Sequence, residues 1–270
     1  LSRCVSLTDI TALEGLTELT SLDLSRCRSL TDLAPLKGLN QLTSLNLSDC
    51  RFLTDISSLT GLTQLTSLDL CFCEALTDLT PLKELINLIE IDLNNCNSIT
   101  NFTPLTGLAQ LTKLNLTRCK SITDLSLLEG LTQLTSLNLM GCKSLTSLTA
   151  LKDLRTLKAL NISACNELNE PHLWWPLEQL PALKKLDCQL PKWFVTRTLA
   201  RAVLGREARV EEVGRGRVGR GGLGEGVLVR AVRDPGAVER RAAGRGAWLR
   251  AAPPHGTCRG TPAASSGAIE

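Results

Sequence analysis

The sequence predicts an α/β fold in which near-identical short units stack into a right-handed, horseshoe-like solenoid. A parallel β-sheet is expected on its concave face, and 3₁₀ or short helical turns on its convex face. Aromatic residues form only 3% of the chain and tyrosine is absent, so leucine must fill the interior. The main observation is a repeat of 23 residues without a slip, marked by one leucine or isoleucine and one cysteine in each unit: Leu7, Leu30, Leu53, Leu76, Ile99, Ile122, Leu145 and Leu168, with Cys4, Cys27, Cys50, Cys73, Cys96, Cys119, Cys142 and Cys165.

The strand of each unit is visible in residues 42–48, where apolar and polar side chains alternate. Alternation with a period of two predicts a short strand that turns Leu45 and Leu47 inward and Ser44 and Asn46 outward. One unit cannot bury its leucines alone. Stacked units can, and their strands then pair into a single parallel sheet.

The convex side of the unit is predicted by leucines that step by three, from Leu30 to Leu39, as suits a 3₁₀ or tight helical turn. Asp32 directly precedes this turn and is expected to cap it, and Pro35 stands where a lost N–H costs little. Asn101 and Ser147 take the place of the aspartate in two units, which is expected to loosen those turns slightly.

The pattern Leu-x-x-Leu-x-Leu-x-x-Cys resembles the leucine-rich-repeat family in its cysteine-bearing variant. The segment LTDLAPLKGLNQLTSLNLS is also similar to the short-repeat bacterial type found in internalins. The resemblance covers about residues 1–190 and implies the fold rather than the function, because one fold hosts many functions.

Three regions are expected along the chain. Residues 1–167 are the repeats, with a truncated N-terminus because residues 1–4 match the end of an earlier unit. Residues 168–196 form a degenerate last repeat and cap, in which Cys188 takes the place of the last strand leucine after a three-residue insertion. The alternative for this region is an aromatic docking site for a following domain, formed by Trp174, Trp175, Trp193 and Phe194.

The region 197–270 differs in composition from the rest of the chain. It has 14 arginines, no lysine and a net charge of +7, whereas residues 1–196 have a net charge of −4. Such a composition rich in arginine, glycine and alanine favours disorder. A native segment and an out-of-frame translation of GC-rich DNA both remain open.

The evenly spaced cysteines are expected to form a structural column inside the stack. Disulfides and a metal site are alternatives, but even spacing gives no preferred pairing and a linear column does not converge on a metal. The third interpretation is a buried small hydrophobe whose S–H donates weakly to a turn carbonyl. Buried free thiols favour a reducing, cytoplasmic location. Cys71 is expected to point to the opposite face, exposed and reactive. The column comprises Cys27, Cys50, Cys73, Cys96, Cys119, Cys142 and Cys165.

The outward strand positions are where a curved solenoid meets a partner. Ordinary drift within a repeat is one explanation of the residues that break the pattern there. The other is a partner-binding patch on the concave face, in which Phe72 and Ile89 are exposed and apolar and opposite charges occupy adjacent units. The patch comprises Asp69, Phe72, Ile89, Glu90, Asp92, Asn94, Lys113, Asn115, Arg118, Asn138 and Met140.

Catalysis is not expected, because His172 and His255 stand away from any convincing serine or cysteine partner and no nucleotide or zinc motif appears. The sequence therefore predicts a non-catalytic protein-interaction scaffold without cofactor, metal, small-molecule substrate or membrane span. One alternative is the sensor region of a larger signalling or effector enzyme. Another is nucleic-acid binding through the arginine- and glycine-rich segment.

Overall fold

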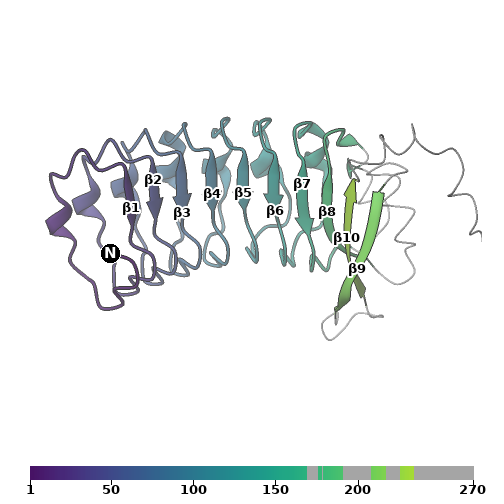
Figure 1. Ribbon diagram of the computed structural model, residues 1–270, viewed down its shortest axis with the longest axis horizontal. Helices are drawn as coiled ribbons and strands as arrows, with labels where there is room; N and C mark the ends of the chain where they lie inside the picture. The colour runs from purple at the N-terminus through teal and green to yellow at the C-terminus, as the bar shows by residue number, and fades with distance from the viewer. Residues whose placement is uncertain (169–175, 178, 191–207, 217–225, 234–270) are drawn as a thin grey trace, which may run out of the picture. The chain divides into compact units, whose positions relative to one another are not determined.

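The computed structural model describes residues 1–168, 176–177, 179–190, 208–216 and 226–233. Over these residues, ten strands form one sheet in the order β1-β2-β3-β4-β5-β6-β7-β8-β10-β9 (Figure 1). The repeat strands are short because each unit contributes only one alternating segment to the sheet. They are β1 (Ser21–Asp23), β2 (Ser44–Asn46), β3 (Ser67–Asp69), β4 (Glu90–Asp92), β5 (Lys113–Asn115), β6 (Ser136–Asn138) and β7 (Ala159–Ile162), followed by β8 (Lys185–Leu190).

The strands from β1 to β8 pair in parallel, and each residue lies beside the residue one repeat later. Leu22 is the Cα partner of Leu45, and Leu45 is the partner of Leu68. From β7 to β8 the spacing lengthens, since Ile162 pairs with Cys188. Cys188 therefore occupies the last strand leucine position, and the predicted three-residue insertion is confirmed.

Short 3₁₀ helices line the side opposite the sheet strands (Figure 1). In the second unit, the Ala34 backbone N–H donates to Oδ1 of Asp32 at 2.7 Å. Asn101 and Ser147 accept the same bond from Thr103 and Thr149 at 2.9 and 3.2 Å, so the capping contact survives both replacements. The helices are η1 (Thr11–Leu13), η2 (Ala34–Leu36), η3 (Ser57–Leu59), η4 (Thr80–Glu84), η5 (Thr103–Leu105), η6 (Ser126–Leu128) and η7 (Thr149–Asp153).

The core is a set of stacked leucine columns between the sheet and the 3₁₀ helices. In the second unit, Leu36, Leu39, Leu45 and Leu47 are all buried, and the same positions are buried in the following repeats. Because every unit contributes the same apolar shape, each repeat packs against its neighbours in the same way.

The sheet continues past β8 into the segment for which the sequence predicts disorder. Strand β10 (Gly226–Arg233) pairs antiparallel with β8, and β9 (Ala208–Gly216) pairs antiparallel with β10. The prediction of disorder therefore fails for these two strands. Valine-rich Gly226–Arg233 has β-propensity, and β8 would otherwise present a row of unpaired backbone groups.

The remainder of 197–270 lies outside the described residues, as do the predicted cap aromatics Trp174, Trp175, Trp193 and Phe194. Leu177, Leu180, Leu183 and Leu186 are buried. Among the helices that the structure describes, none has the length and hydropathy needed to cross a membrane.

Candidate interaction surface on the open face of the sheet

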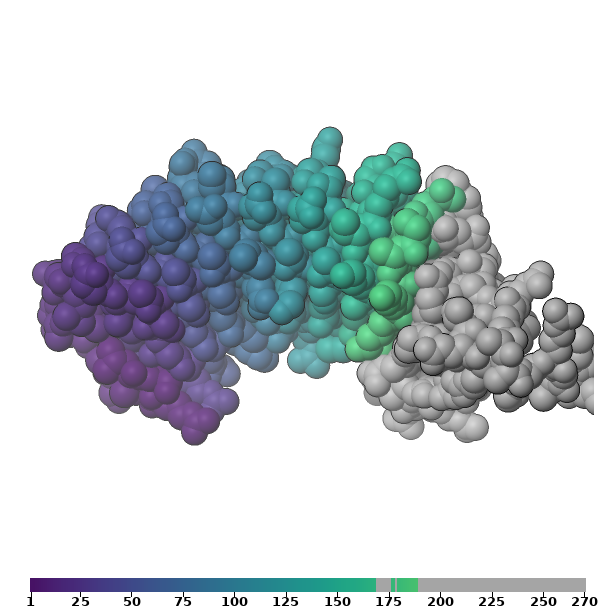
Figure 2. Space-filling model, turned by 45° about the horizontal axis from the view of Figure 1, so that its top comes forward, coloured from purple at the N-terminus to yellow at the C-terminus, as the bar shows by residue number. Residues whose placement is uncertain are grey.

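The open face consists of the side chains that point away from the leucine core on β1–β7 and on the turn after each strand. Alternation along the strand produces this face: Leu45 is buried, while Ser44 and Asn46 on either side are half-buried. Figure 2 shows the units as adjacent bands, coloured from purple at the first repeat to green at the last described one. Residues one repeat apart are therefore neighbours on this face.

An aspartate or asparagine ends each repeat strand and has a structural task there. Its Oδ1 accepts a hydrogen bond from the backbone N–H two residues later, as Asn46 does from Ser48 at 2.9 Å. The equivalent bonds span 2.8 to 3.1 Å and are accepted by Asp23, Asp69, Asp92, Asn115, Asn138 and Asn161. Side chains of this kind stabilise turns by closing them onto the backbone.

The backbone after this bond turns through the left-handed region in every unit. Phe72 has φ of 59° and Arg118 also has 59°, whereas the equivalent residue of the sixth repeat is Gly141, with φ of 74°. This conformation costs little for glycine but is unfavourable for other residues. The cysteine of the column follows directly.

The predicted cysteine column is present, and every described cysteine is free. The Cys50 Sγ donates to the carbonyl oxygen of Leu24 at 3.4 Å, one strand back in the stack. Cys73, Cys96, Cys119, Cys142 and Cys165 make the same contact at 3.1 to 3.2 Å. Burial raises the pKa of the Cys50 thiol to about 12, so it stays protonated. These contacts agree with the interpretation of a buried small hydrophobe.

Opposite charges do meet on the open face, as predicted, at β4 and β5. The Lys113 ammonium forms an ion pair with the Glu90 carboxylate, its neighbour in the parallel register. The Asn115 amide donates to Oδ2 of Asp92 at 2.8 Å. Arg118 is exposed in the turn after β5.

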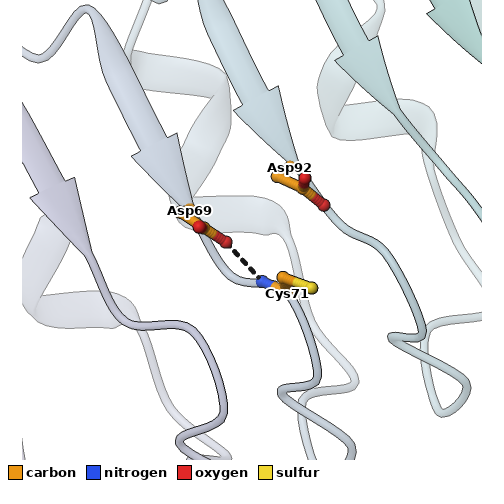
Figure 3. Close-up of side chains that lie close together, drawn as sticks. All are labelled: Asp69, Cys71 and Asp92. Atoms are coloured by element: carbon orange, nitrogen blue, oxygen red, sulfur yellow. Dashed lines mark hydrogen bonds between the residues drawn. The ribbon is translucent and has the colours of Figure 1, made fainter. Parts of the chain in front are cut away.

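Asp69, Cys71 and Asp92 come together at the ends of β3 and β4 (Figure 3). One carboxylate oxygen of each aspartate and the Cys71 Sγ lie within 4.8 Å of one another. Burial raises the pKa of Asp69, and the nearby charges of Asp92 and Asp23 add to the effect. In the described part of the chain, this is the group whose ligand atoms are close enough to share a metal ion. The 23-residue step predicts that Asp69 and Asp92 are neighbours, but the sequence analysis did not combine them with Cys71.

Cys71 does not behave as predicted. It is half-buried rather than exposed, and the Asn94 amide donates to its Sγ at 3.1 Å. Burial, with a smaller contribution from the charge of Asp92, raises the pKa of its thiol to about 12. Because the thiolate is the nucleophile, this cysteine is not activated, and the prediction of a reactive thiol is wrong.

The predicted apolar pair is only half present. Ile89 is 41% exposed, as expected, but Phe72 is half-buried in a turn where its φ is 59°. Phe52, which follows Arg51 in the chain, was not predicted as part of the patch, yet it is 65% exposed. A phenylalanine outside the leucine pattern was the available signal. Asn94, Asn138 and Met140 of the predicted patch are half-buried.

Comparison with known proteins decides the family. A family model described as leucine-rich repeats, in two copies, matches residues 40–84. The crystal structure of internalin C2 from Listeria monocytogenes is 32% identical over 66% of this chain and 74% of that chain, with a TM-score of 0.55. The chain belongs to the internalin-like leucine-rich-repeat family.

Two further Listeria monocytogenes structures share the fold of this leucine-rich-repeat chain at 23% identity. Internalin F has a TM-score of 0.55, over 74% of this chain and 63% of that one. The functional domain of InlJ, described as including a cysteine ladder, has a TM-score of 0.50, over 77% of this chain and 51% of that one. A search of curated proteins gave no match.

Proposed function

We propose that this leucine-rich-repeat chain is a non-catalytic module that binds another protein through the open face of its sheet, between residues 71 and 118. One observation carries the proposal: departures from the repeat gather on β4, β5 and the turns beside them. Ile89 stands where most other units carry threonine, and Glu90 and Lys113 stand where most carry serine, while Arg118 is an exposed arginine at a turn position that Arg26 occupies in the first repeat. Interfaces favour such clusters of apolar and arginine side chains.

The arrangement of the polar groups supports binding over catalysis. The aspartates and asparagines of the open face lie in a column, and each accepts the turn bond that closes its own repeat. Catalysis needs groups that converge on one reacting atom. Asp69, Cys71 and Asp92 do converge, but the pKa of the Cys71 thiol is raised to about 12, so it is not an activated nucleophile. The other side chains of the face are evenly spaced and individually anchored, which suits an extended contact with a second protein.

The family supports the same proposal at a coarser level. Leucine-rich-repeat proteins present one sheet face to protein partners, and the fold leaves that face free of its own connecting turns. A reducing, cytoplasmic location is part of the proposal and is supported by the free, protonated thiols of the column.

The test is a variant in which charges change while the turn bonds remain. Glu90→Lys and Lys113→Glu exchange the ion pair, Arg118→Glu reverses an exposed charge, and Asp92→Asn keeps the acceptor for the Asn94 N–H. Cross-linking with the unmodified chain identifies the partner, whose affinity for both chains is then measured by calorimetry. We expect affinity to fall by about tenfold or more, the effect of losing central charged contacts.

The matched control changes four exposed charges on the side opposite the sheet: Lys37→Glu, Glu129→Lys, Lys152→Glu and Asp153→Asn. Its affinity should stay within about twofold of the unmodified chain, and both variants should unfold within about 1 kcal/mol of it. Equal binding by the unmodified chain and the open-face variant would reject this surface as the interface.

A further inference from the structure

Asp69 and Asp92 are two carboxylates that lie side by side on the open face. They are direct Cα partners across β3 and β4, so two like charges face each other. In the part of the chain that the structure describes, no lysine or arginine pairs with either of them. Asp49 and Glu90 nearby do form such pairs, with Arg28 and Arg51 and with Lys113, whereas Asp23 on β1 has no lysine or arginine partner among the described residues either.

The hydrogen bonds of the two carboxylates leave one oxygen open. Asp92 accepts the Asn94 N–H on Oδ1 and the Asn115 amide on Oδ2, both at 2.8 Å. Asp69 accepts the Cys71 N–H on Oδ1 at 2.9 Å, while its Oδ2 has no donor among the described residues. A carboxylate has about four lone-pair sites, so both groups can accept further bonds from a cation placed between them.

The charge of this pair is not needed for the fold. Asn138 and Asn161 occupy the same register positions in β6 and β7 and close the same turn through Oδ1. Like charges placed opposite each other on adjacent strands are destabilising. The uncompensated charge is therefore available to a cation from outside the chain.

A basic side chain fits the pair better than a metal ion. The Cys71 thiol, with its pKa raised to about 12, offers no thiolate until a metal displaces its proton. A calcium ion takes six to eight oxygen ligands, and here three of the four carboxylate oxygens already accept hydrogen bonds. A guanidinium needs only acceptor lone pairs, and its planar fork can donate to two carboxylates at once.

A second, independent departure lies on the same strand. Threonine hydroxyls form a ladder at the start of the strands: Thr66 Oγ1 donates to the carbonyl of Thr43 at 3.0 Å, and Thr135 to that of Thr112 at 3.1 Å. Ile89 takes this position before β4, loses the hydroxyl bond and exposes 41% of its surface. It precedes Asp92 by three residues, or about 10 Å along a strand.

We propose that the Asp69–Asp92 pair receives an arginine side chain of the protein partner, carried on an extended segment whose apolar residue packs on Ile89. The inference rests on the proposed function and deepens it by naming the chemistry of the partner. The open Oδ2 of Asp69 and the remaining lone pairs of Asp92 accept the guanidinium N–H groups.

The probe is a fluorescein-labelled octapeptide of alternating arginine and valine, compared with the same peptide carrying neutral citrulline in place of arginine. Binding to the full chain is followed by fluorescence anisotropy at low ionic strength. We expect the arginine peptide to bind about tenfold or more tightly than the citrulline peptide. Asp69→Asn with Asp92→Asn should lower its affinity by a similar factor, as when a hydrogen-bonded charge pair loses one partner.

The matched control is Asp55→Asn with Asp78→Asn, which removes two charges from the capping side while asparagine keeps the cap, as Asn101 does. This control should change affinity by less than about twofold. Equal losses in both variants would mean general charge attraction and would overturn the assignment. The assignment would also be overturned if calcium or zinc displaced the peptide from the unmodified chain but not from the Asp69/Asp92 variant.

The two proposals fail in distinguishable ways. If the open-face variant loses its partner but arginine and citrulline peptides bind alike, the interaction surface stands and the arginine site is rejected. If the arginine peptide binds as expected but the open-face variant keeps its partner, the arginine site stands and the interface lies elsewhere. Unchanged cooperative urea unfolding of the Asp69/Asp92 variant shows that a loss of peptide binding is not a loss of fold.

Discussion

The neighbouring strands β3 and β4 and the neighbouring strands β6 and β7 share one backbone but carry different charges. Asp69 faces Asp92 in the first pair, and Asn138 faces Asn161 in the second. All four side chains accept the turn N–H two residues later, at 2.8 to 3.1 Å. The repeat therefore requires an oxygen at this position, and it does not require a charge.

Within this column, the side-chain oxygen is needed for the fold, whereas the negative charge is the feature that we relate to function. Asparagine accepts the same hydrogen bond without a charge. The negative charge of aspartate adds repulsion between the strands and does not stabilise the fold. Such a cost is typical of sites where stability is exchanged for binding. Outside this column, the two regions are expected to pack in the same way.

The largest effect is expected in the core, where the two regions should behave alike. Leu68 in β3 and Leu137 in β6 are both 1% exposed. Leu68→Ala and Leu137→Ala should each lower the free energy of unfolding by about 2–5 kcal/mol, through lost burial and the cavity left behind. Urea denaturation measures both. A difference between them larger than about 2 kcal/mol would show that the two regions are not packed equivalently.

A smaller effect is expected in the turn after β6. Gly141 has φ of 74°, and an added Cβ would lie 3.2 Å from the Arg118 Cγ. Gly141→Ala should destabilise the chain by about 1–2 kcal/mol, because a side chain is unfavourable in the left-handed region. Adding Arg118→Ala separates the two causes. If the double variant regains full stability, the loss in Gly141→Ala comes from the contact with the Arg118 side chain and not from the left-handed backbone.

The smallest effect is expected from the charge itself. Asp69→Asn should raise the free energy of unfolding at neutral pH by about 0.2–1 kcal/mol, because it removes the repulsion with Asp92. The reverse type of substitution, Asn138→Asp, should lower the free energy of unfolding by less than Asp69→Asn raises it, because the neighbours Asn115 and Asn161 are neutral. Denaturation of the three chains in parallel checks the order.

The pH dependence of the same variant has a defined sign. Burial raises the pKa of Asp69 in the folded chain above its unfolded value, so the folded state takes up the proton more readily. The penalty is present in full above the folded pKa, shrinks as pH falls below that value and is gone below the unfolded pKa. The advantage of Asp69→Asn should therefore shrink on acidification. An advantage that grows at low pH would contradict the cause assigned to the shift.

The regular part of the molecule was predictable because each signal repeats. Leu45 and Leu47 point inward as their alternation predicts, Asp32 caps its turn, and Cys188 replaces a strand leucine after the insertion. The exceptions depend on contacts between repeats. Cys71 is shielded by the amide of Asn94 from the next unit, and Phe72 is partly covered in its left-handed turn.

The strands β9 and β10 were missed for a related reason. The composition of the whole segment 197–270, rich in arginine and glycine, predicts disorder, and local sequence cannot indicate that the edge of β8 is available for pairing. Backbone hydrogen bonds to β8 stabilise these strands, because an extended segment of suitable β-propensity can pair with an open sheet edge.

The sequence by itself determined the stack: a 23-residue period of leucine and cysteine can bury its apolar side chains only by repeating one strand and one turn. Only the tertiary structure decided that the predicted opposite charges of Glu90 and Lys113 form an ion pair, and that Asp69 and Asp92 have no lysine or arginine partner among the described residues. The physical reason is that burial follows from the local period, whereas the energy of a charge depends on which groups the neighbouring repeats place within a few ångströms of it.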